Sequence, residues 1–431
     1  MKRTLSSEPR NKKAKESDNY MEAKYRRVKW ACYVSSISMS VIGNLSPVLF
    51  LTFRDLYGIS YSLLGLLVLI NFMTQLTIDL IFTFFSHKFN IPLAVKLTPV
   101  LAFCGLVLFA LTPWLFPNAV YAGMVVGTVI FSAAGGFGEV LGSPVIAAIP
   151  AKDPDREMSK LHSVYAWGVV FVILFATLFL LLFGRENWQI LTLIFTLVPF
   201  ISFFLYAGAE IPPMETPEKV SGVVAYLKNK NLWLSVFAIF LGGSAECTMA
   251  QWNSGYLEQA LGISKVWGDM FGVAMFGLML GLGRTLYAKY GRRIGHILFL
   301  CAIGSTLCYL VAAVTDIPVL GLAACAFTGF CTSMLWPGNL IVATDRIPGA
   351  GVFLYAMMAA GGDLGASVGP QLVGVITDAV IGSSSMISMA QSLSLTPEQL
   401  GMKLGMLVGM LFPLAAIPVF WHIRKAYPKE K

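Results

Sequence analysis

Long apolar segments recur along the whole chain, and they constrain its fold more than any motif does. A helix of roughly 20 apolar residues is long enough to cross a lipid bilayer. Segments of that kind are predicted at 29–51, 61–84, 91–111, 119–146, 161–183, 188–207, 232–252, 267–287, 294–314, 319–343, 351–379 and 402–423. Hydrophobic residues make up 56% of the chain and charged residues only 13%, a balance that a water-soluble core does not need. The sequence therefore predicts an all-α polytopic membrane protein with twelve transmembrane helices.

The distribution of Lys and Arg predicts the orientation of these helices, because basic loops stay in the cytoplasm. Basic residues crowd the N-terminal tail, the loops after every second span and the C-terminal tail. The other loops hold only Arg54, Arg185, Lys265 and Lys403. We therefore expect both termini in the cytoplasm, and a cell membrane (plasma membrane or bacterial inner membrane) as the location. The same bias accounts for the net charge of +8, so nucleic acid is not an expected partner.

The most polar internal segment, 210–230, divides the chain into two halves of six spans each. The expected organisation is a cytoplasmic basic tail at 1–28, a six-helix half at 29–209, a cytoplasmic linker at 210–230, a six-helix half at 231–424 and a cytoplasmic tail at 425–431. One shift aligns the Gly-Ile-Ser triplet at 58–60 with that at 262–264, and Cys104 with Cys308. A common register of this kind indicates an internal duplication. Duplicated halves are typical of transporters whose site lies at the midplane between them.

Few charged residues lie inside the predicted spans, where each one costs roughly 2.5 to 3.5 kcal/mol. The candidates for a functional role are Asp79, Glu139, Glu246, Arg284 and Asp363. Glu139 stands in GGFGEVLGSP, where glycines leave one side of the helix without bulk. Removal from water disfavours the ionised carboxylate, so a buried Glu can hold a proton near neutral pH. Glu139 is thus predicted to couple protons to transport, with a permanently neutral Glu in a helix interface as the alternative. For Asp79 and Asp363 structural roles are expected.

Several motifs resemble those of the major facilitator superfamily. RTLYAKYGRR at 284–293 resembles its Gly-x-x-x-Asp-Arg-x-Gly-Arg-Arg loop, whereas the matching first-half segment at 85–89 lacks the Asp and the Gly. GEVLGSP is similar to the Glu-x-x-x-Asn-Pro segment of the fucose–proton symporter branch, with Ser143 replacing the Asn. Glu246, Trp252 and Tyr256 follow the Glu-x5-Trp-x3-Tyr pattern of fucose-permease-like proteins. The resemblance implies the twelve-helix fold of the superfamily and Glu139 as the proton-coupling residue. The predicted gating residues are Arg284, Lys289, Arg292 and Arg293.

Polar side chains and aromatic rings inside the spans suit a sugar, whose C–H face stacks on a ring while its hydroxyl groups form hydrogen bonds. The predicted substrate-binding residues are Asn44, Asn71, Gln75, His162, Tyr165, Glu246, Trp252, Trp336 and Asn339. The resemblance places His162 and Tyr165 where the fucose carrier presents amides, and Asn44 in the region where it has an acidic residue. These departures make fucose itself an unsafe prediction, and core packing remains the alternative for each single Trp.

The predicted function is secondary active transport of a small polar solute, a sugar or sugar derivative, by proton symport with alternating access. Two alternatives stay open. One is a proton-coupled antiporter or facilitated exporter of another solute, with an amine group bound at Glu246. The other is a non-transporting receptor derived from a carrier. No zinc pair, nucleophile turn or phosphate loop is found, which argues against an enzyme.

The expected partners are the small-molecule substrate and the lipid bilayer, and the chain is expected to be monomeric. We expect no metal and no cofactor other than the coupled proton. The outer loop at 381–403 is long, and Thr396 and Gln399 fit a helix cap. It is predicted to hold a short helix that acts as a lid over the outer mouth.

Overall fold

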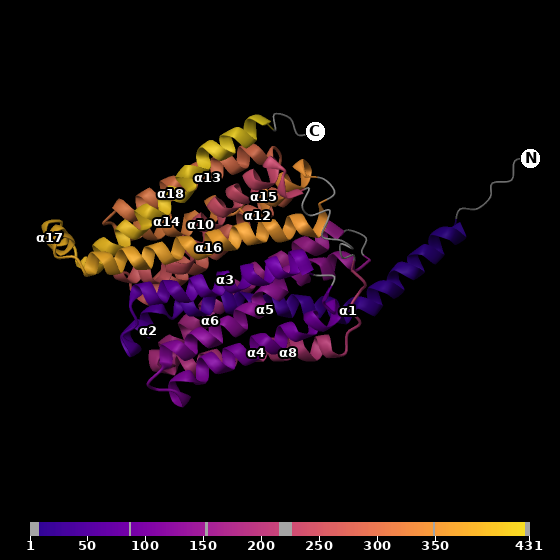
Figure 1. Cartoon of the computed structure of the whole chain (residues 1–431), viewed down its shortest axis with the longest axis horizontal. Coiled ribbons are helices and arrows are strands. Elements are labelled where there is room, and N and C mark those ends of the chain that lie inside the picture. Colours follow the sequence, from indigo (N-terminus) through magenta and orange to yellow (C-terminus); the bar gives the residue numbers. More distant parts are fainter. Residues whose placement is uncertain (1–7, 86–87, 151–153, 215–225, 348–349, 427–431) are drawn as a thin grey trace, which may run out of the picture.

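The computed structural model describes residues 8–85, 88–150, 154–214, 226–347 and 350–426, and these residues form helices joined by short connections (Figure 1). The first half contains α1 (Glu8–Val48), α2 (Phe50–Tyr57), α3 (Tyr61–Phe85), α4 (Ile91–Leu115), α5 (Val120–Ala148), α6 (Pro154–Phe183), the short η2 (Arg185–Asn187), α7 (Trp188–Phe195) and α8 (Leu197–Ala207). The second half contains α10 (Lys230–Gln259), α11 (Lys265–Gly268), the π-helical turn η3 (Asp269–Val273), α12 (Ala274–Tyr290), α13 (Ile294–Val314), α14 (Pro318–Thr332), α15 (Pro337–Arg346), α16 (Gly351–Ile381), α17 (Ser384–Ser392) and α18 (Pro397–Ala426).

Length and hydropathy confirm the predicted number of spans. In the described part of the chain, 11 helical segments are long and apolar enough to cross a membrane. The twelfth span is the pair α1 and α2, which is bent by 48°. The bend follows Pro47, whose ring cannot continue the hydrogen-bond ladder of a helix. The predicted span ends agree with the helices within a few residues for most spans, and α13 matches the predicted 294–314.

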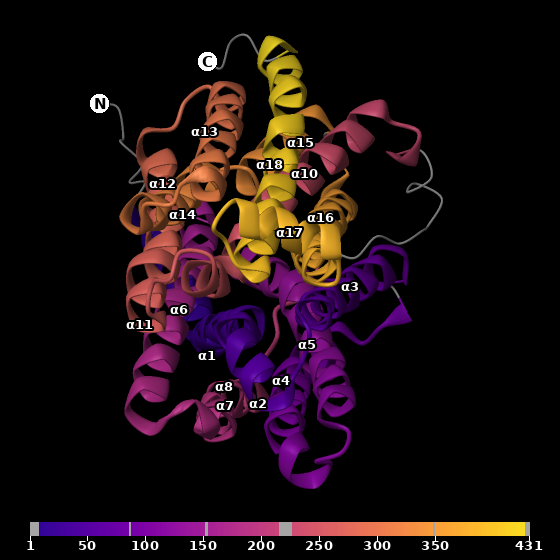
Figure 2. The same cartoon turned by 90° about the vertical axis from the view of Figure 1, so that its left-hand side faces the viewer.

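The two halves lie side by side with their long helices roughly parallel (Figure 1). Both chain termini lie at one end, which we call the termini end, and α2 and α17 lie at the other, which we call the α2 end. Two helix pairs form the seams between the halves: α3 packs against α16 on one side, and α6 packs against α12 on the other (Figure 2). These are the second and eleventh spans and the fifth and eighth, as expected of duplicated halves that face each other.

The tenth span is broken in the middle. It consists of α14 and α15, with turns at 333–336 between them. Pro337 begins α15, a position where the missing N–H of proline costs nothing. The break leaves the Ser333 carbonyl free to accept a hydrogen bond from outside its own helix. Irregular backbone at membrane depth is tolerated where it is buried in protein or lines a cavity.

The loop at 381–403 contains the short helix that the sequence predicts, α17. The predicted cap is also confirmed, because Gln399 N–H donates to the Thr396 hydroxyl at 3.1 Å and Thr396 N–H donates to the Gln399 side chain at 2.9 Å. This reciprocal pair begins α18. The lid function of α17 stays a prediction.

The predicted tails and linker fall partly outside the described residues. Helix α1 starts at Glu8, inside the predicted basic tail, and runs without interruption into the first span. The ranges 1–7, 215–225 and 427–431 lie outside the part of the chain that the structure describes. The division into tail, half, linker, half and tail therefore remains an expectation.

Candidate transport site

A polar seam joins α3 and α5 inside the first half. The Asn71 side-chain carbonyl accepts from Gln75 at 3.1 Å and from the Ser132 hydroxyl at 2.6 Å, and all three side chains are buried. A Cβ atom on Gly135 would lie 2.9 Å from the Gln75 carbonyl oxygen, so this glycine allows the close approach of the two helices. Asn71 and Gln75, both predicted to bind substrate, thus bond within their own half.

This seam leads to a cluster of three carboxyl groups. Asp79 lies one turn beyond Gln75 on α3, Glu139 lies on α5, and Asp363 lies on α16 of the other half. One carboxylate oxygen from each lies within 4.8 Å of the other two. Asp79 and Asp363 are buried and Glu139 is half-buried. Three carboxylates this close cannot all ionise in a low-dielectric environment, so the cluster favours shared protons or a bound cation.

A second charged group lies in the other half, where Arg284 of α12 forms an ion pair with Glu246 of α10. Its Nη2 atom lies 3.2 Å from Glu246 Oε1 and 3.4 Å from Oε2. Its Nε atom donates to the Ser333 carbonyl at the break in the tenth span, at 3.1 Å. The side chains keep 25% and 14% of their surface exposed. The pair is therefore held firmly but is not sealed inside a packed core.

Residues of the first half lie opposite this pair. Gly277 and Gly281 share a face of α12 with Arg284. A Cβ atom added to Gly277 would lie 3.5 Å from Val170 of α6, and one added to Gly281 would lie 3.9 Å from Ala166. The Tyr165 side chain on α6 lies within electrostatic range of both members of the pair and of Glu139. The region between α6, α10 and α12 thus brings together the predicted residues Tyr165 and Glu246 with Arg284.

Two further contacts close this region. Gln251 of α10 donates to the Gly43 carbonyl of α1 at 3.2 Å, across the two halves. A Cβ atom on Gly43 would lie 3.6 Å from the Tyr165 hydroxyl. Asn44, the next residue on α1, is half-buried and donates to the Ser40 carbonyl of its own helix at 2.9 Å. Asn44 and Tyr165 of the first half and Gln251 of the second half thus lie around one polar region between the halves.

Of the remaining predicted substrate residues, Trp252 and Asn339 are buried and Trp336 is half-buried. Trp252 is fully buried, donates to the Pro370 carbonyl at 2.7 Å and packs against Phe50 with ring centroids 5.1 Å apart. Trp336 packs over Gly243, whose added Cβ would lie 3.1 Å from the ring. Asn339 is buried and donates to the Leu335 carbonyl. His162 lies on α6, but its side chain is outside the described part of the structure.

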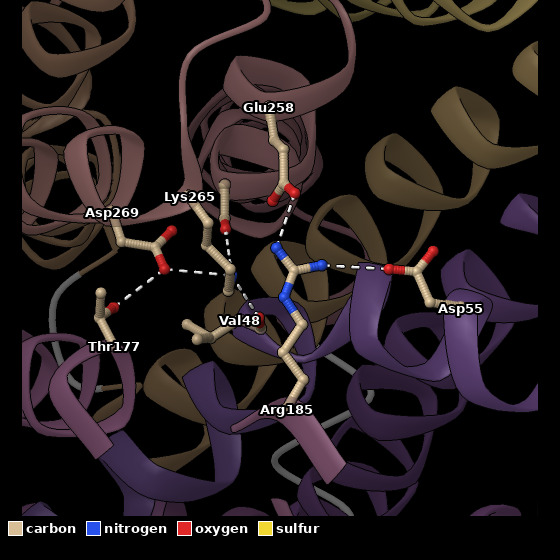
Figure 3. Close-up of polar contacts among 8 residues, drawn as sticks. Val48, Asp55, Thr177, Arg185, Glu258, Lys265 and Asp269 are labelled. Carbon is tan, nitrogen blue, oxygen red and sulfur yellow. Dashed lines mark hydrogen bonds and ion pairs between the residues drawn. The ribbon is translucent and has the colours of Figure 1, made fainter. Parts of the chain in front are cut away.

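The α2 end is closed by charged contacts between the halves (Figure 3). The Lys265 ammonium group donates to the Val48 carbonyl at 2.7 Å and to Ser254 at 2.9 Å, and it pairs with Asp269 at 3.1 Å. Asp269 also accepts from Thr177 of α6 at 2.9 Å. Lys265 and Asp269 belong to the second half and Val48 and Thr177 to the first. The Lys265 and Asp269 side chains are only 9% and 0% exposed.

A second set of contacts surrounds this one. Arg185 of the first half pairs with Glu258 of the second at 2.8 Å and with Asp55 at 3.1 Å (Figure 3). The Asp378 carboxylate of α16 accepts from the backbone N–H groups of Tyr61 and Ser62 at 3.3 and 2.6 Å. An acidic side chain at the N-terminus of α3 satisfies N–H groups that have no partner in the helix. Both contacts tie the halves together at the α2 end.

The other predicted gating residues lie at the termini end. Lys289, Arg292 and Arg293 are exposed around the short connection between α12 and α13. The Lys289 ammonium group lies 5.1 Å from the Tyr290 ring centroid. Arg293 adopts a left-handed backbone conformation, with φ at 56°. The gating function of these residues stays a prediction.

Sequence reasoning did not group Asp79 and Asp363 with Glu139, and it treated Lys265 and Arg185 only as basic loop residues. For Lys265, the sequence did contain a signal of an ion pair. Asp269 lies four residues after Lys265, a spacing that brings opposite charges together on a helix. For the carboxyl cluster the sequence shows three acidic residues in three separate spans, and only the packing of α3, α5 and α16 brings them together.

Comparison with known proteins is consistent with this geometry. The model of the Major Facilitator Superfamily matches residues 31–370. A D-xylose–proton symporter structure has a TM-score of 0.69 at 14% identity, covering 92% of this chain and 99% of that one. A bacterial homologue of the human lysosomal transporter Spinster has a TM-score of 0.67 at 14% identity, with 93% and 97% covered. The E. coli fucose:proton symporter FucP has a TM-score of 0.60 at 13% identity, with 91% and 99% covered. No curated protein sequence matches significantly.

Proposed function

The chain belongs to the Major Facilitator Superfamily and is a transporter rather than an enzyme, and on this premise we propose that it carries a small polar solute, a sugar or sugar derivative, by proton symport. The single observation that carries the proton coupling is the cluster of Asp79, Glu139 and Asp363. It contains carboxyl groups from both halves, so its proton occupancy depends on how the halves are arranged. A proton site formed by both halves couples proton binding to the movement of one half relative to the other.

The coupling follows from the cost of charge in a dry interface. With the halves together at α3 and α16, the ionised cluster repels itself and a proton relieves the repulsion. When the halves separate at this seam, water reaches the carboxylates and the proton can leave. Glu139 is the most accessible of the three, and we assign it the exchange of the proton. Asp79 and Asp363 hold the shared proton in the closed arrangement.

The contacts at the α2 end support alternating access. The Lys265 and Arg185 contacts close that end, and the polar region around Glu246 and Tyr165 lies between the halves below it. With the termini in the cytoplasm, as proposed from the basic loops, the closed end faces the outside. Opening it requires that these charged contacts separate while the halves stay in contact at the termini end.

A sugar or sugar derivative is supported by the chemistry of the site. Tyr165, Glu246, Arg284 and Gln251 offer donors and acceptors in one region, as hydroxyl-rich solutes require. Structures of similar fold include transporters described as symporters of xylose and fucose with protons. The amine-binding alternative is weakened because the Glu246 carboxylate already pairs with Arg284. A receptor derived from a carrier would not need to keep the carboxyl cluster.

The test is uptake into proteoliposomes with an imposed inward proton gradient, using labelled sugars and comparing wild type with Glu139→Gln, Asp79→Asn and Asp363→Asn. The expected result is accumulation above equilibrium in the wild type, and only equilibration or exchange in Glu139→Gln. Glu398→Gln, at the start of α18 and far from the cluster in sequence, is the matched control. Equal, gradient-independent uptake by wild type and Glu139→Gln would show that the carboxylate is structural and the protein a uniporter.

A further inference from the structure

The Arg284–Glu246 ion pair has a binding capacity that its contacts do not exhaust. Arg284 uses Nε for the Ser333 carbonyl and Nη2 for Glu246. Its Nη1 atom, which carries two N–H donors, has no hydrogen-bond partner among the described residues. A quarter of the side chain is exposed. Two contacts thus fix the orientation of the Arg284 guanidinium group, and its Nη1 donors are available to bind a ligand.

The position of the Arg284 guanidinium group indicates that its ligand is the transported solute. Arg284 shares the face of α12 on which Gly281 lies opposite Ala166 of α6, so its side chain is at the seam between the halves. A Cβ atom added to Gly243, three residues before Glu246 on α10, would lie 2.6 Å from the carbonyl oxygen of Gly362, which precedes Asp363 on α16. The ion pair and the carboxyl cluster therefore share one electrostatic neighbourhood.

Resting on the proposed symport, we propose that Arg284 binds a carboxylate of the substrate, which makes the substrate class a sugar acid rather than a neutral sugar. A fixed guanidinium inside a membrane is costly, and a neutral sugar does not require one. The N–H groups of Nη1 are charge-assisted donors, which form strong hydrogen bonds with a carboxylate. Glu246 keeps the guanidinium paired while the site is empty, and it holds Nη2 while the two N–H groups of Nη1 donate to the substrate carboxylate.

Charge balance links this site to the proton site. Binding of one substrate carboxylate adds one negative charge beside the Arg284–Glu246 pair. One proton taken up by the Glu139 cluster adds one positive charge, so the loaded carrier has the same net charge as the empty one. The anion raises the proton affinity of the cluster, and by linkage the proton raises the affinity for the anion to the same extent. No covalent bond forms or breaks.

The energetic signature of this scheme differs from that of neutral sugar symport. One anion carried with one proton moves no net charge, so the pH gradient drives uptake and the membrane potential does not. A neutral sugar carried with one proton moves one positive charge. A potential of about 100 mV then changes accumulation by about 50-fold.

The experiment compares D-glucuronate with D-glucose, and D-galacturonate with D-galactose, since each pair differs only in a carboxylate at one carbon. Binding is measured by calorimetry on purified protein, and uptake is measured in proteoliposomes with either a pH gradient or a potassium diffusion potential alone. We expect a uronate to bind, with an affinity about 10- to 100-fold lower in Arg284→Gln, and to accumulate with the pH gradient only. Arg284→Lys should recover part of the affinity.

Two further variants keep the test interpretable if Arg284→Gln folds poorly. Glu246→Gln/Arg284→Gln removes both charges and leaves no unpaired ion in the membrane. Lys230→Gln removes an exposed positive charge at the start of α10 and should leave binding unchanged. A loss of uronate affinity in the double variant with native thermal stability supports the proposal.

The outcomes separate this inference from the proposed symport. Neutral sugars that accumulate with the proton gradient while neither uronate binds would overturn the substrate class and leave symport intact. Uronate binding that depends on Arg284 without any response to the proton gradient would overturn symport and leave the substrate class intact. Equal uronate binding by wild type and Arg284→Gln, or no uronate binding at all, overturns the inference.

Discussion

The two ends of the molecule are held in different ways. At the α2 end, charged side chains of one half bond to the other half, as Lys265 does to Val48 and Arg185 does to Glu258. At the termini end, the described ion pairs lie within the first half: Lys24 pairs with Glu210 and Lys29 with Glu157. The described contact between the halves there is apolar, through Phe84. Among the described residues, charged contacts thus join the two halves at the α2 end, whereas the described ion pairs at the termini end lie within the first half.

This difference suggests why the closed α2 end can also open. Buried charges that lose their partners are costly, whereas the same charges become stable again when water reaches them. The charged contacts of Lys265 and Arg185, which we call the latch, are therefore strong while water is excluded and weak once water enters. This favours two discrete states over a gradual opening. Asp269 lies in the π-helical turn η3, and such turns occur often at functional positions in helices.

The largest expected effect comes from breaking the buried part of the latch. Lys265→Met would leave Asp269 buried with only Thr177 as a partner. Removal of one partner of a buried ion pair costs roughly 3 to 5 kcal/mol. We expect the α2 end to open, and the distance between spin labels at Leu56 and Trp267, both exposed there, to increase in pulsed electron paramagnetic resonance.

Two variants serve as controls for this measurement. Lys265→Met/Asp269→Leu removes both charges and should restore most of the closed population, since a well-packed apolar pair can replace a buried ion pair. Lys230→Met, at an exposed position on α10, should leave the distance unchanged. An unaltered label distance in Lys265→Met would show that apolar packing around Trp252 closes this end without the charges.

A smaller effect in the same direction is expected from Arg185→Gln. The Arg185 side chain is 35% exposed and that of Glu258, its partner in the other half, is 20% exposed, so water and salt partly screen the pair. Such contacts contribute about 1 kcal/mol or less, which shifts the two-state population about fivefold. The shift should fade at high salt, and Arg185→Glu combined with Glu258→Arg should reverse part of it. An effect as large as that of Lys265→Met would place the main latch at Arg185.

The fold could be predicted from the sequence because the bilayer sets the length of every span. Apolar runs such as 294–314 have to be helical when no water is present to satisfy their backbone, and α13 has these bounds. The breaks were not predicted. The bend at Leu49 follows Pro47 and the turns at 333–336 precede Pro337. These prolines are weak signals in the sequence, because other prolines such as Pro99 lie inside continuous helices.

The candidate site was predictable only in part. Glu139 could be found because a charge among glycines is conspicuous in an apolar run. Its neighbours Asp79 and Asp363 could not, because their proximity depends on the register of α3, α5 and α16. The pairing of Arg284 with Glu246 likewise depends on how far α12 and α10 slide past each other. Sequence patterns locate unusual residues, whereas helix packing decides which of them meet.

Loss of the apolar contact at the termini end is expected to open that end instead of the α2 end. Phe84 of α3 packs against a cluster of the second half that includes Leu354 and Met357. Phe84→Ala should weaken closure at this end by about 1 kcal/mol, because the side chain is only half-buried and loses part of its apolar contact. Labels at Lys88 and Lys228 should move apart while those at the α2 end stay close. Phe203→Ala, on the exposed face of α8, is the control.

The smallest effect concerns Glu157, which joins α1 and α6 within the first half. Burial opposes its ionisation, but hydrogen bonds from Lys160, Lys29 and Tyr33 outweigh this and lower its pKa to about 2. A lowered pKa means that the contact stabilises the fold above the ordinary Glu value and is lost only as the pH falls toward about 2. Glu157 thus stays ionised between pH 5 and 8. We expect Glu157→Gln to lower the melting temperature by roughly 2 °C and to leave the pH profile of uptake unchanged. A shifted pH profile of uptake in Glu157→Gln would instead indicate that Glu157, at the termini end, takes part in proton coupling.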